Sequence, residues 1–320
     1  MSSSTSSSRN EWKAIAVALA TLIACETGVR LIGPSISKDI RHIRQFPKIA
    51  QTLDQDRRLR ILFLGNSLTK AGADVDAFKS ELQKNQLDPA CAVTAPDNTV
   101  LFDWYYVFKN VFESTDKAPD MVIVGFYKAQ MEDSTKTFTR SFGHDFCNLR
   151  ENATEVFEHE FTEFEDRASF IISSFSSAYT YQNRIKKRVM DVILPDCRVA
   201  MSRLNRMEKA AGESRQAKNR VKPPPTYNRL KRFIAMAKRA RTHVVFVAMP
   251  PGNWSLDTEI PKIVEHSGMT FVDCRIDSLP TLPSDYFSDG YHLNEAGAAI
   301  YSRFLAEKLV PEIRRLTSRR

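Results

Sequence analysis

Short apolar runs alternate with amphipathic stretches over most of the chain beyond residue 57. Five of these runs read as buried strands: Leu59–Leu64, Ala90–Thr94, Met121–Phe126, His243–Met249 and Thr270–Asp273. Each is short, and Gly, Pro, Asn or Asp residues flank most of them, as is typical of buried strands. Strands that alternate with helices predict a parallel sheet with helices on both of its faces.

Stretches with apolar residues at helical spacing follow or precede these strands. We expect helices over Asp74–Lys84, Trp104–Glu113 and Tyr227–Arg241, and a final helix that Asn294 caps and that runs through Leu309. The alternation lapses between Gln130 and Pro225. This part of the chain is therefore predicted to be an irregular or helical insertion in an α/β domain.

The N-terminus carries an uncharged apolar run, Ala14–Cys25, shortly after Arg9 and Lys13. Twelve residues suit the core of a secretory signal, whereas a membrane span needs roughly 20. Extended from Trp12 to Ile32, the segment is long enough to cross a bilayer. Residues 22–25 also resemble the lipobox of bacterial lipoproteins, in which the cysteine is lipidated. An uncleaved anchor is favoured, while a lipoprotein, a cleaved signal or a helix buried against soluble protein stays open.

The anchor and signal interpretations both place the bulk of the chain outside the cytosol, because positive charge stays inside. We therefore expect a membrane-anchored, extracytoplasmic protein of the bacterial periplasm or cell surface. The expected division is an anchor or signal over residues 1–34, a polar connector over 35–56, and a catalytic domain over 57–320 with an insertion at about 130–226.

Charge is distributed unevenly along this chain of net charge +8. Arg184–Arg241 contains 18 Lys or Arg against four acids, whereas Glu151–Asp166 contains seven acids and no Lys or Arg. The basic segment is either a solvated helical face that pairs with the acidic one or a binding surface for an anionic polymer. No nucleic-acid-binding signature accompanies it, so we expect no nucleic-acid partner.

The five cysteines show neither CxxC spacing nor a Cys/His pattern, so we expect no metal and no cofactor. With Cys25 set aside, the other four are compatible with two disulfides outside the cytosol or with buried, reduced thiols.

Three residues in two separate loops carry candidate catalytic chemistry. Ser67 lies two residues beyond the first predicted strand, and reactive groups in open α/β sheets lie at the carboxyl ends of strands. A serine needs a neighbouring base to remove its proton, and that base needs a partner that orients it. His292 is a candidate base, and Asp289 lies three residues before it on a loop that Gly290 allows to turn.

These two segments resemble the first and last blocks of the SGNH (GDSL-like) hydrolase family. Residues 65–69 (GNSLT) are similar to the GDSL block, and residues 289–297 (DGYHLNEAG) are similar to the C-terminal DxxH block. The resemblance covers roughly residues 57–309 apart from the insertion. It implies a three-layer, flavodoxin-like parallel sheet (the SGNH hydrolase fold), here with a helical insertion and an N-terminal apolar helix. It also implies a triad of Ser67, Asp289 and His292.

The chain departs from the family at the blocks that bind the oxyanion. Asn66 replaces the Asp of GDSL, and Asp97 or Asn98 stands where a glycine is usual. The third block, usually GxND, falls at residues 125–128 and lacks the Asn. We expect Lys128 or Gln130 to substitute as donors. Asn253 follows a strand at the active edge and is a further candidate for the pocket, as is the neighbouring Trp254.

The leading expectation is a serine esterase or O-acyltransferase that forms an acyl-Ser67 intermediate. With its N-terminal anchor and degenerate oxyanion blocks, the chain resembles membrane-attached family members that add or remove acyl groups on cell-envelope polymers. The expected substrate is therefore an acyl ester, for example of an envelope polysaccharide. The alternative is a catalytically weak SGNH-fold module that binds envelope glycan or a partner enzyme. The sequence does not indicate the oligomeric state.

Overall fold

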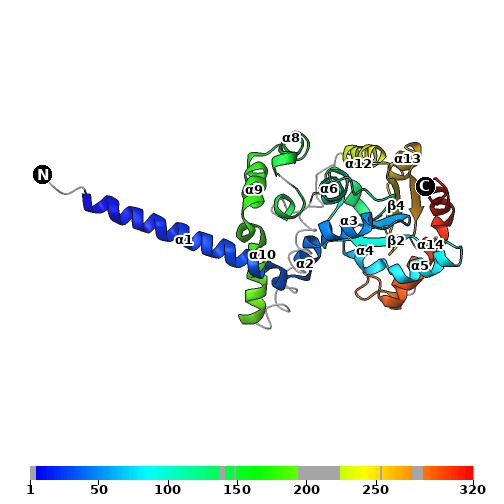
Figure 1. The fold of residues 1–320 in the computed structure, drawn as a ribbon, viewed down its shortest axis with the longest axis horizontal. Coiled ribbons are helices and arrows are strands. Elements are labelled where there is room, and N and C mark those ends of the chain that lie inside the picture. Colours follow the sequence, from blue (N-terminus) through cyan, green and yellow to red (C-terminus); the bar gives the residue numbers. More distant parts are fainter. Residues whose placement is uncertain are drawn as a thin grey trace, which may run out of the picture. The chain divides into compact units, whose positions relative to one another are not determined.

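A computed structural model describes residues 5–136, 141–147, 149–193, 224–252, 254–275 and 284–319 (Figure 1). The chain divides into two compact units. We call one the helical unit; it comprises Met1–Arg41, Thr139–His144 and Asn148–Pro224. The other is the sheet unit, which comprises His42–Phe138, Asp145–Cys147 and Pro225–Arg320. The structure thus groups the N-terminal segment with the insertion.

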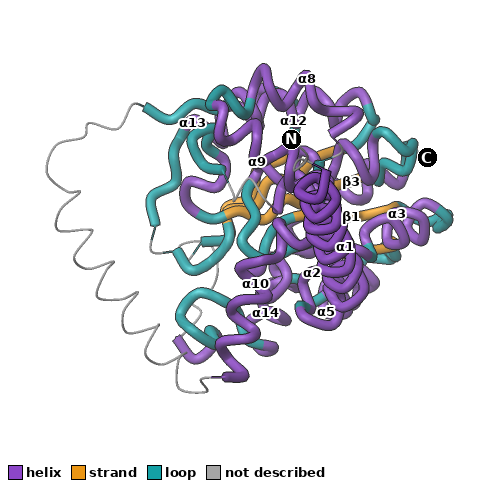
Figure 2. Tube along the Cα trace, turned by 90° about the vertical axis from the view of Figure 1, so that its left-hand side faces the viewer, coloured by secondary structure: helices purple, strands orange, loops and turns teal. Residues whose placement is uncertain are grey.

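The sheet unit is built on five parallel strands, which lie side by side among the helices in Figure 2. They are β1 (Arg60–Leu64), β2 (Ala90–Thr94), β3 (Met121–Phe126), β4 (His243–Ala248) and β5 (Thr270–Asp273). Their order is β2-β1-β3-β4-β5, so the chain leaves β1 in one direction and later returns to β1's other side with β3. The predicted parallel α/β sheet is confirmed. In such sheets ligands bind beyond the carboxyl ends of the strands at this reversal.

Helices cover both faces of the sheet (Figure 1). On one face, α14 (Glu295–Thr317) packs against α4 (Ser67–Gly72) and α5 (Val75–Gln83). On the other, α12 (Asn228–Arg239) packs against α6 (Leu101–Val107) and the π-helix η1 (Phe108–Glu113) that continues it. Three further helices lie against neighbouring parts of the chain: α3 (Phe46–Asp54) against β2 and η1, α13 (Glu259–His266) against β5, and the short η4 (Ser284–Tyr286) against α14.

Two predicted boundaries differ from the structure because burial extends the helices. The helix expected over Trp104–Glu113 begins at Leu101, and Leu101 and Phe102 are fully buried. The last helix continues past Leu309 and through Pro311 to Thr317, because Ile313 on this extension is fully buried.

Residues 35–56, expected to be a polar connector with some helical character, are largely helical. After α1 they form α2 (Lys38–Arg44) and α3, and Phe46, Ala50 and Leu53 of α3 are buried. These positions recur at helical spacing, so α3 presents one apolar face to the protein and a polar face to solvent.

The helical unit contains α1 (Thr5–Ile36), α8 (Leu149–His159), α9 (Phe164–Phe175) and α10 (Ser177–Ile193). Helix α10 contacts both α1 and α9, and α8 contacts α9. Phe142, Phe161 and Phe170 are buried and pack ring against ring at centroid distances of 5.7 Å. The described part of the insertion is therefore helical, as predicted, while most of the basic segment, residues 194–223, lies outside the described residues.

Segment Asn10–Gly33 of α1 is long and apolar enough to cross a membrane, and its most apolar 18-residue window has no buried residue. Cys25 is exposed on this helix. Among the cysteines that the structure describes, Cys25, Cys91, Cys147 and Cys274 are free thiols.

Candidate active site

Ser67 is presented by a tight strand-to-helix turn at the carboxyl end of β1. Asn66 caps the helix that Ser67 begins, because its Oδ1 accepts a hydrogen bond from the Leu68 amide at 2.9 Å. The turn requires Gly65, since a Cβ at this position would overlap the side chain of Thr69. The Thr69 hydroxyl in turn donates to the Gly125 carbonyl at 3.3 Å, which ties the turn to the end of β3.

The same turn is tied to the loop that follows β2. The amide of the Asn66 side chain donates to the Thr99 carbonyl at 3.2 Å. The Thr99 hydroxyl donates to carbonyls on both sides, Gly65 at 3.2 Å and Pro96 at 2.7 Å in alternative orientations, and accepts from the Trp104 indole at 2.9 Å. Asn66 is 4 % exposed, and with these bonds its side chain holds the turn that carries Ser67 in place.

His292 lies on a loop that Asp289 organises. One carboxylate oxygen of Asp289 accepts from the backbone amides of Tyr291 (3.0 Å) and His292 (2.8 Å). The other oxygen lies 2.7 Å from His292 Nδ1. Gly290 adopts φ +84° within this turn, a conformation that glycine adopts without steric cost. A single carboxylate therefore both shapes the loop and orients the imidazole.

The two loops meet although 225 residues separate them in sequence. His292 Nε2 lies 2.9 Å from Ser67 Oγ. This distance is within the range that proton transfer requires. Since Asp289 accepts from Nδ1, the lone pair of the neutral ring is at Nε2 and faces the serine hydroxyl.

Electrostatics favour an ionised Asp289. The backbone amide of His292 and then its imidazole, with a smaller contribution from the Tyr291 amide, lower the pKa of Asp289 from 3.8 to about 2. The side chains of Asp289 and His292 are 53 % and 34 % exposed, so the pair lies at an open rim. An ionised carboxylate at this position stabilises the imidazolium that forms when His292 takes a proton.

A cavity of about 480 Å³ opens at Ser67 and His292. This volume is in the range of small-molecule sites. Leu68, Val100, Tyr127 and Tyr291 give it an apolar part, and its other lining residues are polar: Asn66, Asn98, Thr99, Gln130 and Lys136.

The structure brings together some of the predicted binding residues and not others. Asn66, Asn98 and Gln130 line the cavity with Ser67 and His292. Asp97 and Lys128 are not among its lining residues: Asp97 faces Lys70 at 3.3 Å, and the ammonium of Lys128 lies 4.8 Å from the centre of the Tyr127 ring. Asn253 lies outside the described residues.

Asn98 has the backbone conformation expected of the glycine that it replaces. Its φ is +56°, in the left-handed region where Asn is among the better-tolerated residues after glycine. Gln130 is held by the chain itself, because its Oε1 accepts from the Tyr127 amide at 2.8 Å.

Two aromatic residues of the cavity were missed from the sequence. Tyr127 follows β3 directly, at the position where the resemblance called for Asn, and is 9 % exposed. Its ring contacts Tyr291 edge-on at 6.4 Å and Trp254 at 5.3 Å. The available signals were position alone: Tyr127 ends a strand at the active edge, and Tyr291 is adjacent to His292. Trp254 contacts the Tyr127 ring and is not among the lining residues of the cavity.

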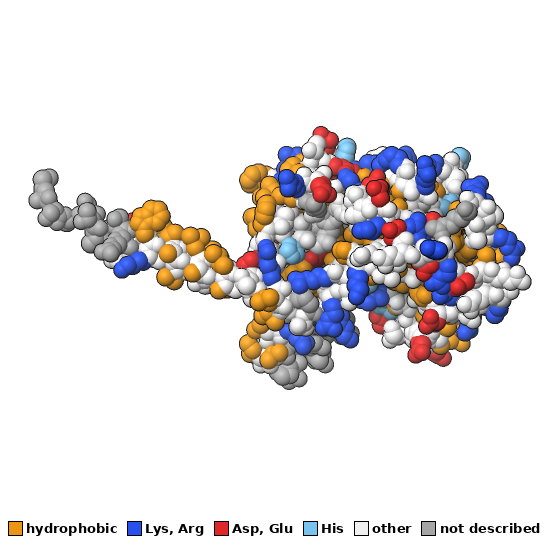
Figure 3. Space-filling model, in the orientation of Figure 1, with side chains coloured by type: hydrophobic (Ala, Val, Ile, Leu, Met, Phe, Trp, Pro, Cys, Tyr) orange, Lys and Arg blue, Asp and Glu red, His pale blue; other side chains and the backbone are white. Residues whose placement is uncertain are grey.

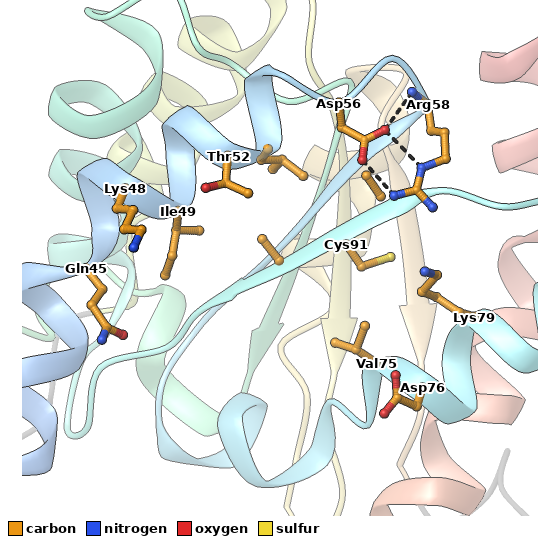
Figure 4. Close-up of a pocket in the computed structure, with 13 residues that line it drawn as sticks. Gln45, Lys48, Ile49, Thr52, Asp56, Arg58, Val75, Asp76, Lys79 and Cys91 are labelled. Atoms are coloured by element: carbon orange, nitrogen blue, oxygen red, sulfur yellow. Dashed lines mark hydrogen bonds and ion pairs between the residues drawn. The ribbon is translucent and has the colours of Figure 1, made fainter.

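A second cavity of about 530 Å³ lies at the outer edge of β2 (Figure 4). Its residues come from α3, α5 and β2, and the Arg58 guanidinium there is paired with Asp56 at 2.6 Å. Burial raises the pKa of its Cys91 to about 12, so this thiol is a poor nucleophile at neutral pH. The chemistry of this cavity is therefore weaker than that of the Ser67 site.

Comparisons with known proteins gave structural likenesses at low identity. A variant of an acetyl-xylooligosaccharide esterase from Geobacillus is 12% identical, with 78% of this chain and 93% of that chain covered, at a TM-score of 0.39. A lipase/acylhydrolase from Enterococcus faecalis is 11% identical (79% and 96% covered, TM-score 0.38), and a lipase from a goat rumen metagenome is 14% identical (77% and 95%, TM-score 0.30). No family model and no curated protein matches the sequence. Because the TM-scores are this low, the function proposed below depends on the chain's own geometry.

Proposed function

We propose that this chain is a serine esterase or O-acyltransferase that acts on acyl esters through an acyl-Ser67 intermediate. The observation that carries the proposal is the 2.9 Å contact between Ser67 Oγ and His292 Nε2, with Asp289 2.7 Å from the other ring nitrogen. Together with the GDSL-like and DxxH-like segments, this geometry supports membership of the SGNH hydrolases.

The reaction follows from the positions of the three side chains. Ser67 Oγ attacks the ester carbonyl carbon while its proton moves to His292 Nε2. When the tetrahedral intermediate collapses, the ester C–O bond breaks, and the departing alcohol oxygen takes that proton. Water or a sugar hydroxyl then attacks the acyl-enzyme, His292 accepts its proton, and Ser67 is released as the proton returns to Oγ. Asp289 stays ionised throughout and stabilises the transient imidazolium.

The negative oxygen of the tetrahedral intermediate needs hydrogen-bond donors near Ser67. Ser67 is the first residue of α4, and a first-turn amide has no acceptor within its own helix. The Ser67 amide is therefore one donor, and the backbone amide of Asn98, a residue that also lines the cavity, is a second. Loss of one such donor costs about a hundredfold or more in rate, so the replacement of the third-block Asn by Tyr127 predicts a slow enzyme.

The proposed setting is the outer side of a bacterial membrane, with an acylated envelope polysaccharide as substrate. The apolar helix Asn10–Gly33 supports attachment to the membrane, and Arg9 and Lys13 at its start favour export of the remainder. The open rim at Asp289 and His292 suits a polymer, since a long chain can lie across it without entering an enclosed tunnel.

Labelling with a serine-reactive fluorophosphonate tests the proposal. We expect the wild-type chain to be labelled once, at Ser67, and labelling to disappear in Ser67→Ala. The matched control is Ser318→Ala, because the Ser318 hydroxyl is exposed and bonds only to the Arg315 carbonyl in its own helix end. Labelling that survives Ser67→Ala contradicts the assignment of the nucleophile.

A catalytically weak module that binds envelope glycan or a partner enzyme is the second candidate, favoured by Tyr127 at the third-block position. It predicts glycan binding without labelling of Ser67. Hydrolase and transferase are separated by supplying an oligosaccharide acceptor with an activated acetyl ester. Acetyl-oligosaccharide as the main product identifies a transferase, whereas free acetate identifies a hydrolase.

A further inference from the structure

The uncharged run at the centre of α1 is shorter than the membrane-length segment Asn10–Gly33 that contains it. The uncharged run Ala14–Cys25 rises about 18 Å, against a hydrocarbon core of about 30 Å. Glu26 and Arg30 follow and form an ion pair at 2.7 Å, and beyond Glu26 the apolar residues Leu31 and Ile32 are again 77 % and 55 % exposed. A bilayer that accommodates this helix must therefore reach the level of Glu26 or thin around it.

Glu26 and Arg30 also hold the corner between α9 and α10. The Glu26 carboxylate accepts from the amides of Ser177 (2.8 Å) and Ala178 (3.0 Å), the first residues of α10. Arg30 donates to the carbonyl of Phe175, the last residue of α9, at 2.9 Å. The α9–α10 corner is thus fixed to α1 at the depth where the short apolar run ends.

Helix α9 carries apolar side chains on its outer surface that the protein leaves uncovered. Phe164, Ile171, Ile172 and Phe175 are 79 %, 41 %, 48 % and 66 % exposed. Their spacing of i, i+7, i+8 and i+11 places them on one face of the helix. Phe170 and Ser173 on its other face are fully buried, so α9 packs with one side and exposes a second apolar side.

Helix α10 adds apolar and basic side chains near its C-terminal end. Val189, Met190, Val192 and Ile193 are 47 %, 43 %, 72 % and 65 % exposed, and Lys186 and Arg188 beside them are exposed. Within the helical unit, orange side chains gather along α9 and α10 on the side from which α1 projects (Figure 3). The exposed acids Glu163 and Glu165 flank Phe164 at the start of α9, at the far end of this helix from the α9–α10 corner.

We propose that the outer faces of α9 and α10 lie in the lipid–water interface and form a second membrane contact around the base of α1. Apolar side chains with neighbouring Lys and Arg are typical of helices that lie in this interface. The contact adds apolar surface beside α1 at the level of Glu26, where the uncharged run of α1 ends. This inference rests on the part of the proposed function that inserts α1 in the membrane, and not on the ester chemistry.

Quenching of tryptophan by brominated lipid tests the contact in the full-length chain. The chain is reconstituted into vesicles of phosphatidylethanolamine and phosphatidylglycerol, with or without bromine on the acyl chains. Four single variants each add one tryptophan: Phe164→Trp and Phe175→Trp in α9, Val17→Trp in α1, and Lys231→Trp on the exposed surface of α12 as a control. The emission added by each variant is obtained by subtracting that of the wild type.

The proposal predicts that brominated lipid removes about half or more of the emission that the two α9 variants and Val17→Trp add, because these side chains reach the acyl boundary. Lys231→Trp is expected to be unaffected. Quenching of Val17→Trp without either α9 variant overturns the second contact and leaves the anchor standing. If no variant is quenched, both the second contact and the membrane anchor are overturned. If the chain then also sediments as a dimer, the apolar face is assigned to a second copy of the chain. Equal quenching of all four indicates unspecific adsorption and also overturns the proposal.

Discussion

Asn66→Asp restores the acid of the GDSL-like pattern and is nevertheless expected to destabilise this protein. Asn66 uses both ends of its side chain: Oδ1 accepts from the Leu68 amide at 2.9 Å, and Nδ2 donates to the Thr99 carbonyl at 3.2 Å. An aspartate keeps the bond from the Leu68 amide. In place of the second bond, a carboxylate oxygen faces the Thr99 carbonyl oxygen, and both are acceptors at a site that is only 4 % exposed. The buried Thr99 carbonyl that is left without its donor costs about 1–3 kcal/mol, so we expect a loss of stability of this size at neutral pH.

The sign of the pH dependence follows from the same contact. Burial and the facing carbonyl raise the folded-state pKa of an acid at position 66, because only its protonated form donates to Thr99. The variant's stability is therefore complete below the unfolded pKa of about 3.9 and declines as pH rises through the higher folded value.

Urea unfolding followed by tryptophan fluorescence measures this effect, since Trp104 lies in the same hydrogen-bond network. The variant and the wild type should converge in acid and diverge toward neutral pH. Asn294→Asp is the matched control. Asn294 also caps a helix, and its side-chain amide also donates to a carbonyl, that of Asp285 at 2.5 Å, but Asn294 is half-exposed. Equal stability of Asn66→Asp and the wild type at pH 7 would refute the reasoning.

Three further predictions concern single side chains. Asp289→Asn should lower kcat for p-nitrophenyl acetate about 10³–10⁴-fold with little change in Tm. The reason is that an amide facing Nδ1 favours the histidine tautomer that carries its proton at Nε2. A loss of kcat below tenfold contradicts the orienting role of Asp289. Asp133→Ala should cost about 1–2 kcal/mol in urea unfolding, since its carboxylate accepts from the first two amides of α12 at 2.7 and 2.8 Å. These amides hold the pKa of Asp133 below its usual value against the opposing effect of burial. The stabilisation by Asp133 is therefore present above about pH 3.9 and is lost as pH falls through the lower folded value. A difference in unfolding free energy between the variant and the wild type that is unchanged between pH 7 and pH 2 contradicts this prediction. Cys91 should resist iodoacetamide at pH 8 in the folded chain and react in urea, because burial raises its pKa to about 12; rapid alkylation of the native protein contradicts this.

The sequence predicted the sheet well because its strands are short, buried and bounded by turn-forming residues. Met121–Phe126 illustrates this: all six residues are buried, and Pro119 and Asp120 precede them. Helix ends were less predictable: the last helix was expected through Leu309, whereas it continues to Thr317 with Ile313 buried.

The sequence also predicted the three residues of the candidate triad, because two family-like blocks lie at opposite ends of one α/β region. It did not indicate the roles of their neighbours. Asn66 was predicted as a binding residue, and only the structure shows that its amide also donates to the Thr99 carbonyl. Tyr127 was missed because the resemblance called for Asn at this position. A family pattern assigns no role to a residue that departs from it. The corner of α9 and α10 escaped notice because its contacts with Glu26 join positions about 150 residues apart.

The most direct test of the account is to trap the covalent intermediate and locate it. The full-length chain is mixed with p-nitrophenyl acetate, quenched in acid within the first turnover, digested and examined by peptide mass spectrometry. We predict one acetyl group per chain on Ser67, and none on that residue in His292→Ala. Turnover of the ester with the acetyl group on another residue, or undiminished turnover in Ser67→Ala, would contradict the central claim.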